Sequence, residues 1–120
     1  MEWKNFKIEE FACSHCGKNE TKDELVSLLQ DLRDSLGVPL RITSGYRCPE
    51  YNKQVSSTGE AGPHTTGLAA DIAVDREAAC NLLEKALQMP FRGIGINQKG
   101  GGRFIHLDIT DRPFRTMWSY

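Results

Sequence analysis

The stretch RFIHLDIT, residues 103–110, limits the possible folds of this chain more than any other segment. Its side chains alternate, so that Phe104, His106 and Asp108 share one face of a strand and the aliphatic residues between them share the other. Because the aliphatic face must be buried, the pattern predicts a strand of a sheet packed on helices, with His106 and Asp108 side by side on a surface or cleft. Their Cα atoms are expected to lie about 7 Å apart.

Hydrophobic spacing predicts helices and further strands in the rest of the chain. Thr21 and Glu24 form a capping-box signature at the start of a leucine-rich helix that ends at Gly37. Asp75 caps a second helix, which ends before Pro90. This order favours an α+β fold with a largely antiparallel sheet packed on helices. The remaining expected elements are strands at 39–43, 70–74 and 92–97, a short helix at 50–56, and a glycine-rich hairpin loop at 100–102.

Length and charge restrict the class of protein. A chain of 120 residues with 39% hydrophobic side chains fits one compact soluble domain, residues 1–120, which we expect to be a monomer. A net charge of -1 gives no broad basic surface for nucleic acid or a membrane, so a neutral or mixed substrate fits better. With neither a signal-peptide pattern nor a long apolar run, we expect synthesis in the cytoplasm without a leader.

Two histidines and an aspartate are candidate metal ligands. The stretch GPHTTGLAADIA, residues 62–73, carries His64 and Asp71 among small side chains, and His106 lies on the predicted last strand. Two imidazoles and a carboxylate suit zinc, and catalytic zinc sites leave a fourth position to a water molecule whose pKa falls to about 7. Taken singly, each of these residues, and Asp108 beside them, is more often an ordinary surface or strand residue than a functional one.

Three motifs together resemble a known family. The segments SGYRCPEYN, HTTGLAAD and FIHLD, in this order, resemble the zinc D-alanyl-D-alanine carboxypeptidases and their relatives, the D-Ala-D-Ala dipeptidases and phage peptidoglycan endopeptidases. The resemblance extends from about Phe6 to Ile109. It implies a fold shared with the hedgehog signalling domain and a zinc ion held by His64, Asp71 and His106.

The resemblance also implies a role for Arg47 of the SGYR motif. In the family this arginine lies in the substrate cleft, where a guanidinium binds a peptide carboxylate or stabilises the oxyanion. Without the motif, a surface ion pair would be the simpler interpretation of Arg47.

Two departures from the family pattern affect the chemistry. Gly62 stands where many members have a serine, two residues before the first histidine ligand. Phe104 and Arg103 stand where many members have a Glu, Asp or His that deprotonates the attacking water. Asp108 is therefore the candidate general base, and the alternative is that it accepts a hydrogen bond from a ligand imidazole and orients it.

The cysteines raise the question of a second metal. Cys13 and Cys16 have the spacing of half a zinc knuckle, and Cys48 or Cys80 could help to complete a structural zinc site. A redox-labile pair and plain buried thiols are the alternatives. We expect His15, between the paired cysteines, to be exposed rather than ligating.

Together these features predict a zinc metallopeptidase that cleaves amide bonds in peptidoglycan peptide stems, either as a carboxypeptidase or as an endolysin-type endopeptidase. The missing leader fits a phage-encoded enzyme that reaches the cell wall by another route. A zinc-containing wall-binding module with reduced turnover and a structural domain of a phage particle are the alternatives.

Overall fold

A five-stranded sheet and three α-helices make up the computed structural model, which describes residues 3–120. The strand order is β1-β2-β4-β3-β5, and all neighbours are antiparallel except β5, which is parallel to β3. This architecture confirms the predicted α+β class. The strands are β1 (Ile42–Ser44), β2 (Ala69–Ala73), β3 (Gly93–Asn97), β4 (Phe104–Asp108) and β5 (Thr116–Ser119), and the α-helices are α1 (Asp23–Leu36), α2 (Pro49–Val55) and α3 (Arg76–Leu87).

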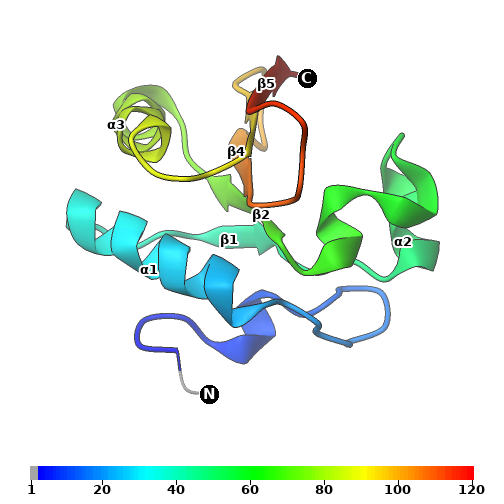
Figure 1. The fold of residues 1–120 in the computed structure, drawn as a ribbon. Helices are drawn as coiled ribbons and strands as arrows, with labels where there is room; N and C mark the ends of the chain where they lie inside the picture. The colour runs from blue at the N-terminus through cyan, green and yellow to red at the C-terminus, as the bar shows by residue number, and fades with distance from the viewer. Residues whose placement is uncertain (1–2) are drawn as a thin grey trace.

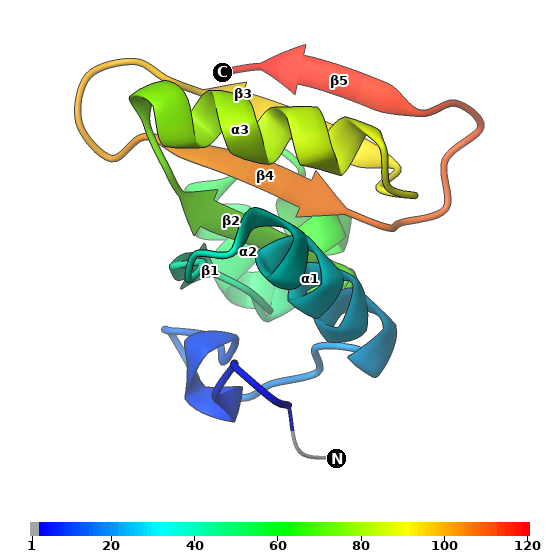
Figure 2. The same ribbon diagram turned by 90° about the vertical axis from the view of Figure 1, so that its left-hand side faces the viewer.

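The helices divide between the two faces of the sheet. Helices α1 and α3 cover one face, whereas α2 and the loops around it lie on the other side (Figures 1 and 2). No helix within residues 3–120 has the length and apolar character to cross a membrane. The layer between the sheet and the helices α1 and α3 is the core, and its largest buried side chains include Leu25, Leu29, Leu32, Ile72, Leu82, Phe91, Ile94, Ile105 and Leu107.

Helix α1 ends as predicted but begins differently. Gly37 takes the left-handed conformation at the C-cap, with φ of 71°, which a glycine adopts without strain. The capping-box prediction at Thr21 is wrong, because Lys22 is the N-cap residue and the Thr21 hydroxyl is buried without a partner. The N–H of Lys22 donates to the carbonyl of Gly67 at 2.9 Å, and this contact fixes where the chain turns into the helix.

Strand β5 was not predicted from the sequence. It is an edge strand that pairs only with β3, and most of its side chains are exposed, so no buried apolar face marks it in the sequence. Arg115 holds the segment before β5 by donating to the carbonyls of Phe91, Ala86 and Met89. Strand β5 thereby brings Trp118 beside the polar face of the sheet.

Candidate metal centre

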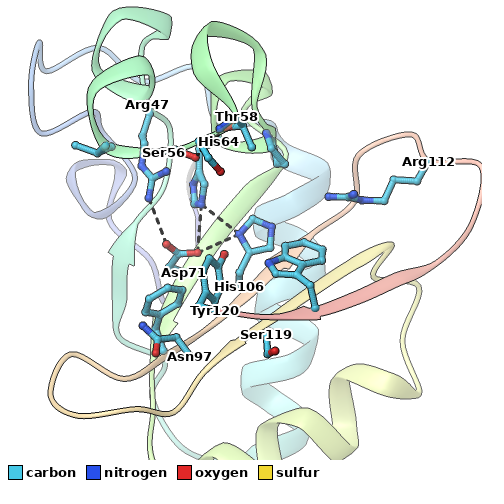
Figure 3. Close-up of a pocket in the computed structure, with 15 residues that line it drawn as sticks. Arg47, Ser56, Thr58, His64, Asp71, Asn97, His106, Arg112, Ser119 and Tyr120 are labelled. Carbon is cyan, nitrogen blue, oxygen red and sulfur yellow. Dashed lines mark hydrogen bonds and ion pairs between the residues drawn. The ribbon is translucent and has the colours of Figure 1, made fainter.

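Three ligand atoms converge on the polar face of the sheet (Figure 3). Asp71 Oδ1 lies 3.2 Å from His64 Nε2 and 3.1 Å from His106 Nδ1, and the two nitrogens are 3.2 Å apart. Asp71 on β2 and His106 on β4 are direct cross-strand partners, and His64 lies on the short 3-10 helix η3 (Pro63–Thr66). All three residues are buried. The structure therefore brings together the three residues that the sequence singled out as metal ligands.

Each imidazole is held in place through the ring nitrogen that does not face the other candidate ligands. His64 Nδ1 lies 2.7 Å from the carbonyl oxygen of Gly45, and His106 Nε2 lies 2.6 Å from Asp108 Oδ2. Acceptors at these positions keep the proton on the outer nitrogen and leave the inner one free to bind a metal, as in characterised zinc sites. The donor set of two imidazole nitrogens and one carboxylate oxygen fits zinc with one open position.

The electrostatics of the centre favour a bound cation. Burial by itself raises the pKa of Asp71, but hydrogen bonds from His106 and His64 outweigh it and hold this pKa well below its ordinary range. Burial likewise lowers the pKa of His106, but the carboxylates of Asp108 and Asp71 outweigh it and raise this pKa. Two ionised carboxylates thus face the imidazoles, and a metal ion would compensate their charge.

Asp108 is more enclosed than the sequence suggested. It has no exposed surface, and both oxygens are engaged: Oδ2 with His106 and Arg112, and Oδ1 with Arg112 and Thr110. The expectation that Asp108 lies on a surface or cleft is therefore wrong, because Arg112 from the segment after β4 covers it. This geometry favours the orienting role, and its role as the general base stays a prediction.

Replacing Asp108 with asparagine should weaken zinc binding by about 10-fold to 100-fold, because the amide cannot hold His106 and Arg112 as the carboxylate does. Chelator competition measures the affinity, and the rate at saturating zinc should stay within a few-fold of the wild type. Asp111→Asn, which removes an exposed charge three residues further on, is the matched control. Unchanged affinity with turnover abolished at saturating zinc would instead make Asp108 the base.

Gly93 leaves the space that the Asp108 carboxylate occupies. The two residues are cross-strand partners on β3 and β4, and a Cβ atom at position 93 would lie 2.6 Å from Asp108 Cγ. Gly93→Ala is therefore expected to lower the free energy of unfolding by about 1–3 kcal/mol and to weaken zinc binding. Gly101→Ala is the control, because a Cβ there meets nothing within 4 Å. If urea unfolding and zinc affinity are the same in both variants, this packing argument is wrong.

A cleft of about 760 Å³ opens beside the three ligands. Arg47 lies at its edge, and Figure 3 shows its guanidinium directed at Asp71, with Nη2 3.4 Å from Asp71 Oδ2. Two further contacts fix the guanidinium: Nε lies 3.1 Å from Ser44 Oγ, and Nη1 lies 3.1 Å from Asn52 Oδ1. The structure thus places Arg47 beside the candidate metal ligands. Asn52 is a buried residue of the SGYRCPEYN segment that the sequence analysis did not single out.

Aromatic side chains from the end of the chain line the same cleft. The ring of Trp118 lies 5.1 Å from that of His106, and the Arg112 guanidinium lies 5.1 Å above the indole. Tyr120 packs on Phe104 with a ring separation of 5.1 Å. Their sequence, residues 113–120, gives aromatic composition but not position, which depends on the pairing of β5 with β3.

Thr58 explains the glycine that departs from the family pattern. A Cβ atom at Gly62 would collide with the Thr58 hydroxyl and lie 2.7 Å from Thr58 Cβ. Thr58 lines the cleft and is held by Asn52, whose amide donates to its hydroxyl at 2.8 Å. A hydroxyl is therefore present at this place although residue 62 supplies none.

Within residues 3–120, the cleft has no evident replacement for the general base that many family members have at the positions of Phe104 and Arg103. Of the described residues that line the cleft, none besides the three candidate ligands carries a carboxylate or an imidazole. Phe104 lines the cleft without a titratable group, and Arg103 donates to the carbonyl of Gly100 in the hairpin loop. No side chain takes the place of the upstream base at these positions.

Comparison with known proteins identifies one family. The sequence model of the family described as Peptidase M15 matches residues 4–108, from the N-terminal segment to the end of β4. The matched part contains all three candidate ligands and Arg47, whereas β5 lies beyond it. No curated protein matches the chain.

Proposed function

The chain belongs to the peptidase M15 family of zinc metallopeptidases, and on this premise we propose that it hydrolyses amide bonds in the peptide stems of bacterial peptidoglycan. The observation that carries the proposal is the convergence of His64 Nε2, Asp71 Oδ1 and His106 Nδ1 beside an open cleft. This is the donor set of a catalytic zinc site with a position left for water or substrate.

The residues around the centre have distinct tasks in this proposal. A zinc ion bound by the three ligands would supply a Lewis acid that polarises the scissile carbonyl and acidifies water. Asp108 holds the proton on His106 Nε2 and so keeps the ring in the ligating orientation. Trp118 covers the His106 ring and limits the access of bulk water to it.

Arg47 is the candidate for contact with the substrate. Ser44 and Asn52 hold its guanidinium in a fixed orientation beside Asp71. A guanidinium there can donate to the carbonyl oxygen as negative charge develops, or bind the free carboxylate of a terminal D-alanine. The second task favours carboxypeptidase action, because an endopeptidase substrate has no free carboxylate at the cleaved bond.

Incubation with purified peptidoglycan tests the proposal. Zinc-loaded protein is expected to release fragments that mass spectrometry identifies, and His106→Ala is expected to release none. Free D-alanine would identify a carboxypeptidase, and longer stem peptides an endopeptidase. If protein shown to contain zinc releases neither from several wall types, the proposed activity is refuted.

The cleft also supports a second candidate function. Because no other carboxylate or imidazole among the described residues lines the cleft, the domain could hold zinc and bind peptide stems with little turnover, as a wall-binding or phage structural module. This alternative predicts that the zinc-loaded protein sediments with insoluble peptidoglycan and releases nothing. In either case we propose that the domain acts at the cell wall.

A further inference from the structure

Three cysteine sulfurs converge at a second place in the fold. The Sγ atoms of Cys13, Cys16 and Cys48 all lie within 4.8 Å of one another. The first two lie in the N-terminal segment, and Cys48 is the N-cap residue of α2. None of them lines the cleft beside the histidines. Cys80 is exposed on α3 and lies outside this cluster, so only one of the two cysteines considered from the sequence joins the pair.

The local backbone has the form of a metal-binding knuckle. The N–H of Gly17 donates to the Cys13 carbonyl at 2.8 Å, and the N–H of Cys13 donates to the Lys18 carbonyl at 2.7 Å, which closes a turn around the paired cysteines. Gly17 has φ of 76°, a conformation that glycine adopts without strain. The N–H of Cys48 lies 3.4 Å from Cys13 Sγ and donates to it, a contact that stabilises a thiolate.

The exposure of the sulfurs argues against the alternatives. Cys16 is exposed and Cys48 is half-buried, so these thiols do not serve as small core side chains. A disulfide could join only two of the three and would leave the last one unpaired. Cys13 is buried, and its sulfur lies close to those of the other two cysteines. Three cysteines held together in this way form, once deprotonated, a donor set that zinc accepts in structural sites, where one further ligand completes the tetrahedron.

We propose that Cys13, Cys16 and Cys48 bind a structural zinc ion, with His15 as the fourth ligand. His15 Nδ1 lies 3.6 Å from Cys48 Sγ, close to the separation of about 3.5 Å between nitrogen and sulfur ligands of one tetrahedral zinc. The ring of His15 stacks on Tyr51 of α2 with a centroid distance of 5.5 Å and an interplanar angle of 6°. His15 is exposed, as the sequence predicted, but ligation by His15 departs from the expectation that it is not a ligand. His15 is not part of the group whose ligand atoms all lie within 4.8 Å of one another, so its ring must shift towards Cys13 and Cys16 to bind the same ion.

This zinc would fix the loop that serves the catalytic centre. Cys48 follows Arg47 directly, and the loop before it already contacts the N-terminal segment, because the N–H of Tyr46 donates to the Phe11 carbonyl at 2.8 Å. The Gly45 carbonyl in the same loop holds His64. A metal that joins residues 13–16 to Cys48 would therefore hold the N-terminal segment and the loop before Cys48 together, next to the hydrogen bond between Tyr46 and Phe11. This structural role does not depend on the peptidase activity.

Metal analysis of the whole protein under reducing conditions tests the proposal. Wild-type protein should contain about two zinc ions per chain, and His106→Ala about one. Adding Cys16→Ser to His106→Ala should remove the remaining ion, whereas adding Cys80→Ser should leave it. Both cysteines are exposed, so neither substitution opens a cavity in the core.

Cobalt absorption and thermal unfolding test the cysteine site without any measurement of catalysis. Cobalt-substituted His106→Ala should show thiolate-to-cobalt charge-transfer absorption that Cys16→Ser removes, and chelation should lower its melting temperature. His15→Ala should weaken the remaining zinc at least about 10-fold, and unchanged affinity would overturn the fourth ligand. Absence of the charge-transfer band, or a disulfide among the three cysteines in the freshly purified protein, would overturn the site.

Discussion

Alanine at position 106 is expected to remove zinc from the catalytic centre and to lower the hydrolysis of peptidoglycan stems by about a thousandfold or more. His106 supplies one of the three ligand atoms, and it is also the residue through which Asp108 acts on the centre. With two ligands left, the metal and its several kcal/mol of transition-state stabilisation are both lost. Metal content and initial rates on a synthetic stem peptide measure the two effects.

Controls separate this loss from misfolding. His106 is buried, so its removal could also destabilise the sheet, and circular dichroism should show the variant folded at the assay temperature. Asp71→Asn, which nearly preserves side-chain shape, should lose zinc and activity in the same way, whereas Lys99→Ala in the exposed hairpin loop should lose neither. Full turnover by folded His106→Ala would contradict the assignment of the metal centre.

Arg47→Ala is expected to reduce kcat/KM by about a hundredfold to a thousandfold at saturating zinc, the usual cost of removing a donor to the developing oxyanion. Arg47 is fixed by Ser44 and Asn52 at the edge of the cleft. The loss of activity should therefore come from the missing contact between Arg47 and the substrate, rather than from a change in the fold. Because Arg47 also pairs with Asp71, the zinc content of the variant must be measured alongside its rate. Arg47→Lys keeps the charge but not the planar fork, and should recover only part of the rate.

The two possible tasks of Arg47 give different kinetics. If it binds a terminal carboxylate, Arg47→Ala should mainly raise KM for stem peptides with a free C-terminus and should change little for amidated ones. If it stabilises the oxyanion, kcat should fall for both. A variant that keeps its zinc and stays within a few-fold of wild type on both substrates would contradict any contact between Arg47 and the substrate.

Side-chain periodicity was sufficient to predict most of the fold. The alternation in β4 and the leucine spacing of α1 report which faces are buried, and burial is a local property of the pattern. The glycine-rich loop between β3 and β4 is also a local signal, and it predicted that these two strands form an antiparallel hairpin. These features depend on few tertiary contacts and can therefore be predicted from the sequence. The five-stranded sheet and the three α-helices of residues 3–120 confirm the predicted α+β class.

Features that depend on pairing were not predictable in this way. Strand β5 gains its position from hydrogen bonds to β3 and from Arg115, not from an apolar face. The position of Trp118 beside the cleft could therefore not be predicted from the sequence. The burial of Asp108 depends on Arg112 folding back over it. The choice of Cys48 over Cys80 likewise required distances between segments far apart in the sequence.

The candidate ligands fall between these cases. Spacing alone left His64 and Asp71 as ordinary residues. They became candidates for a zinc site through their combination with His106 and through the order of the three motifs. Their meeting with His106 follows from the register that pairs Asp71 with His106 across β2 and β4. A shift of one residue in that register would turn the two side chains to opposite faces of the sheet, so no local pattern could have established it.

Zinc titration of the metal-free protein, with hydrolysis of a peptidoglycan stem peptide as the readout, tests the central claim most directly. We predict that the rate rises with occupancy of the centre formed by His64, Asp71 and His106, and that His106→Ala abolishes the response. Wild-type protein that has filled this centre and still leaves every bond of the stem peptide intact would contradict the account.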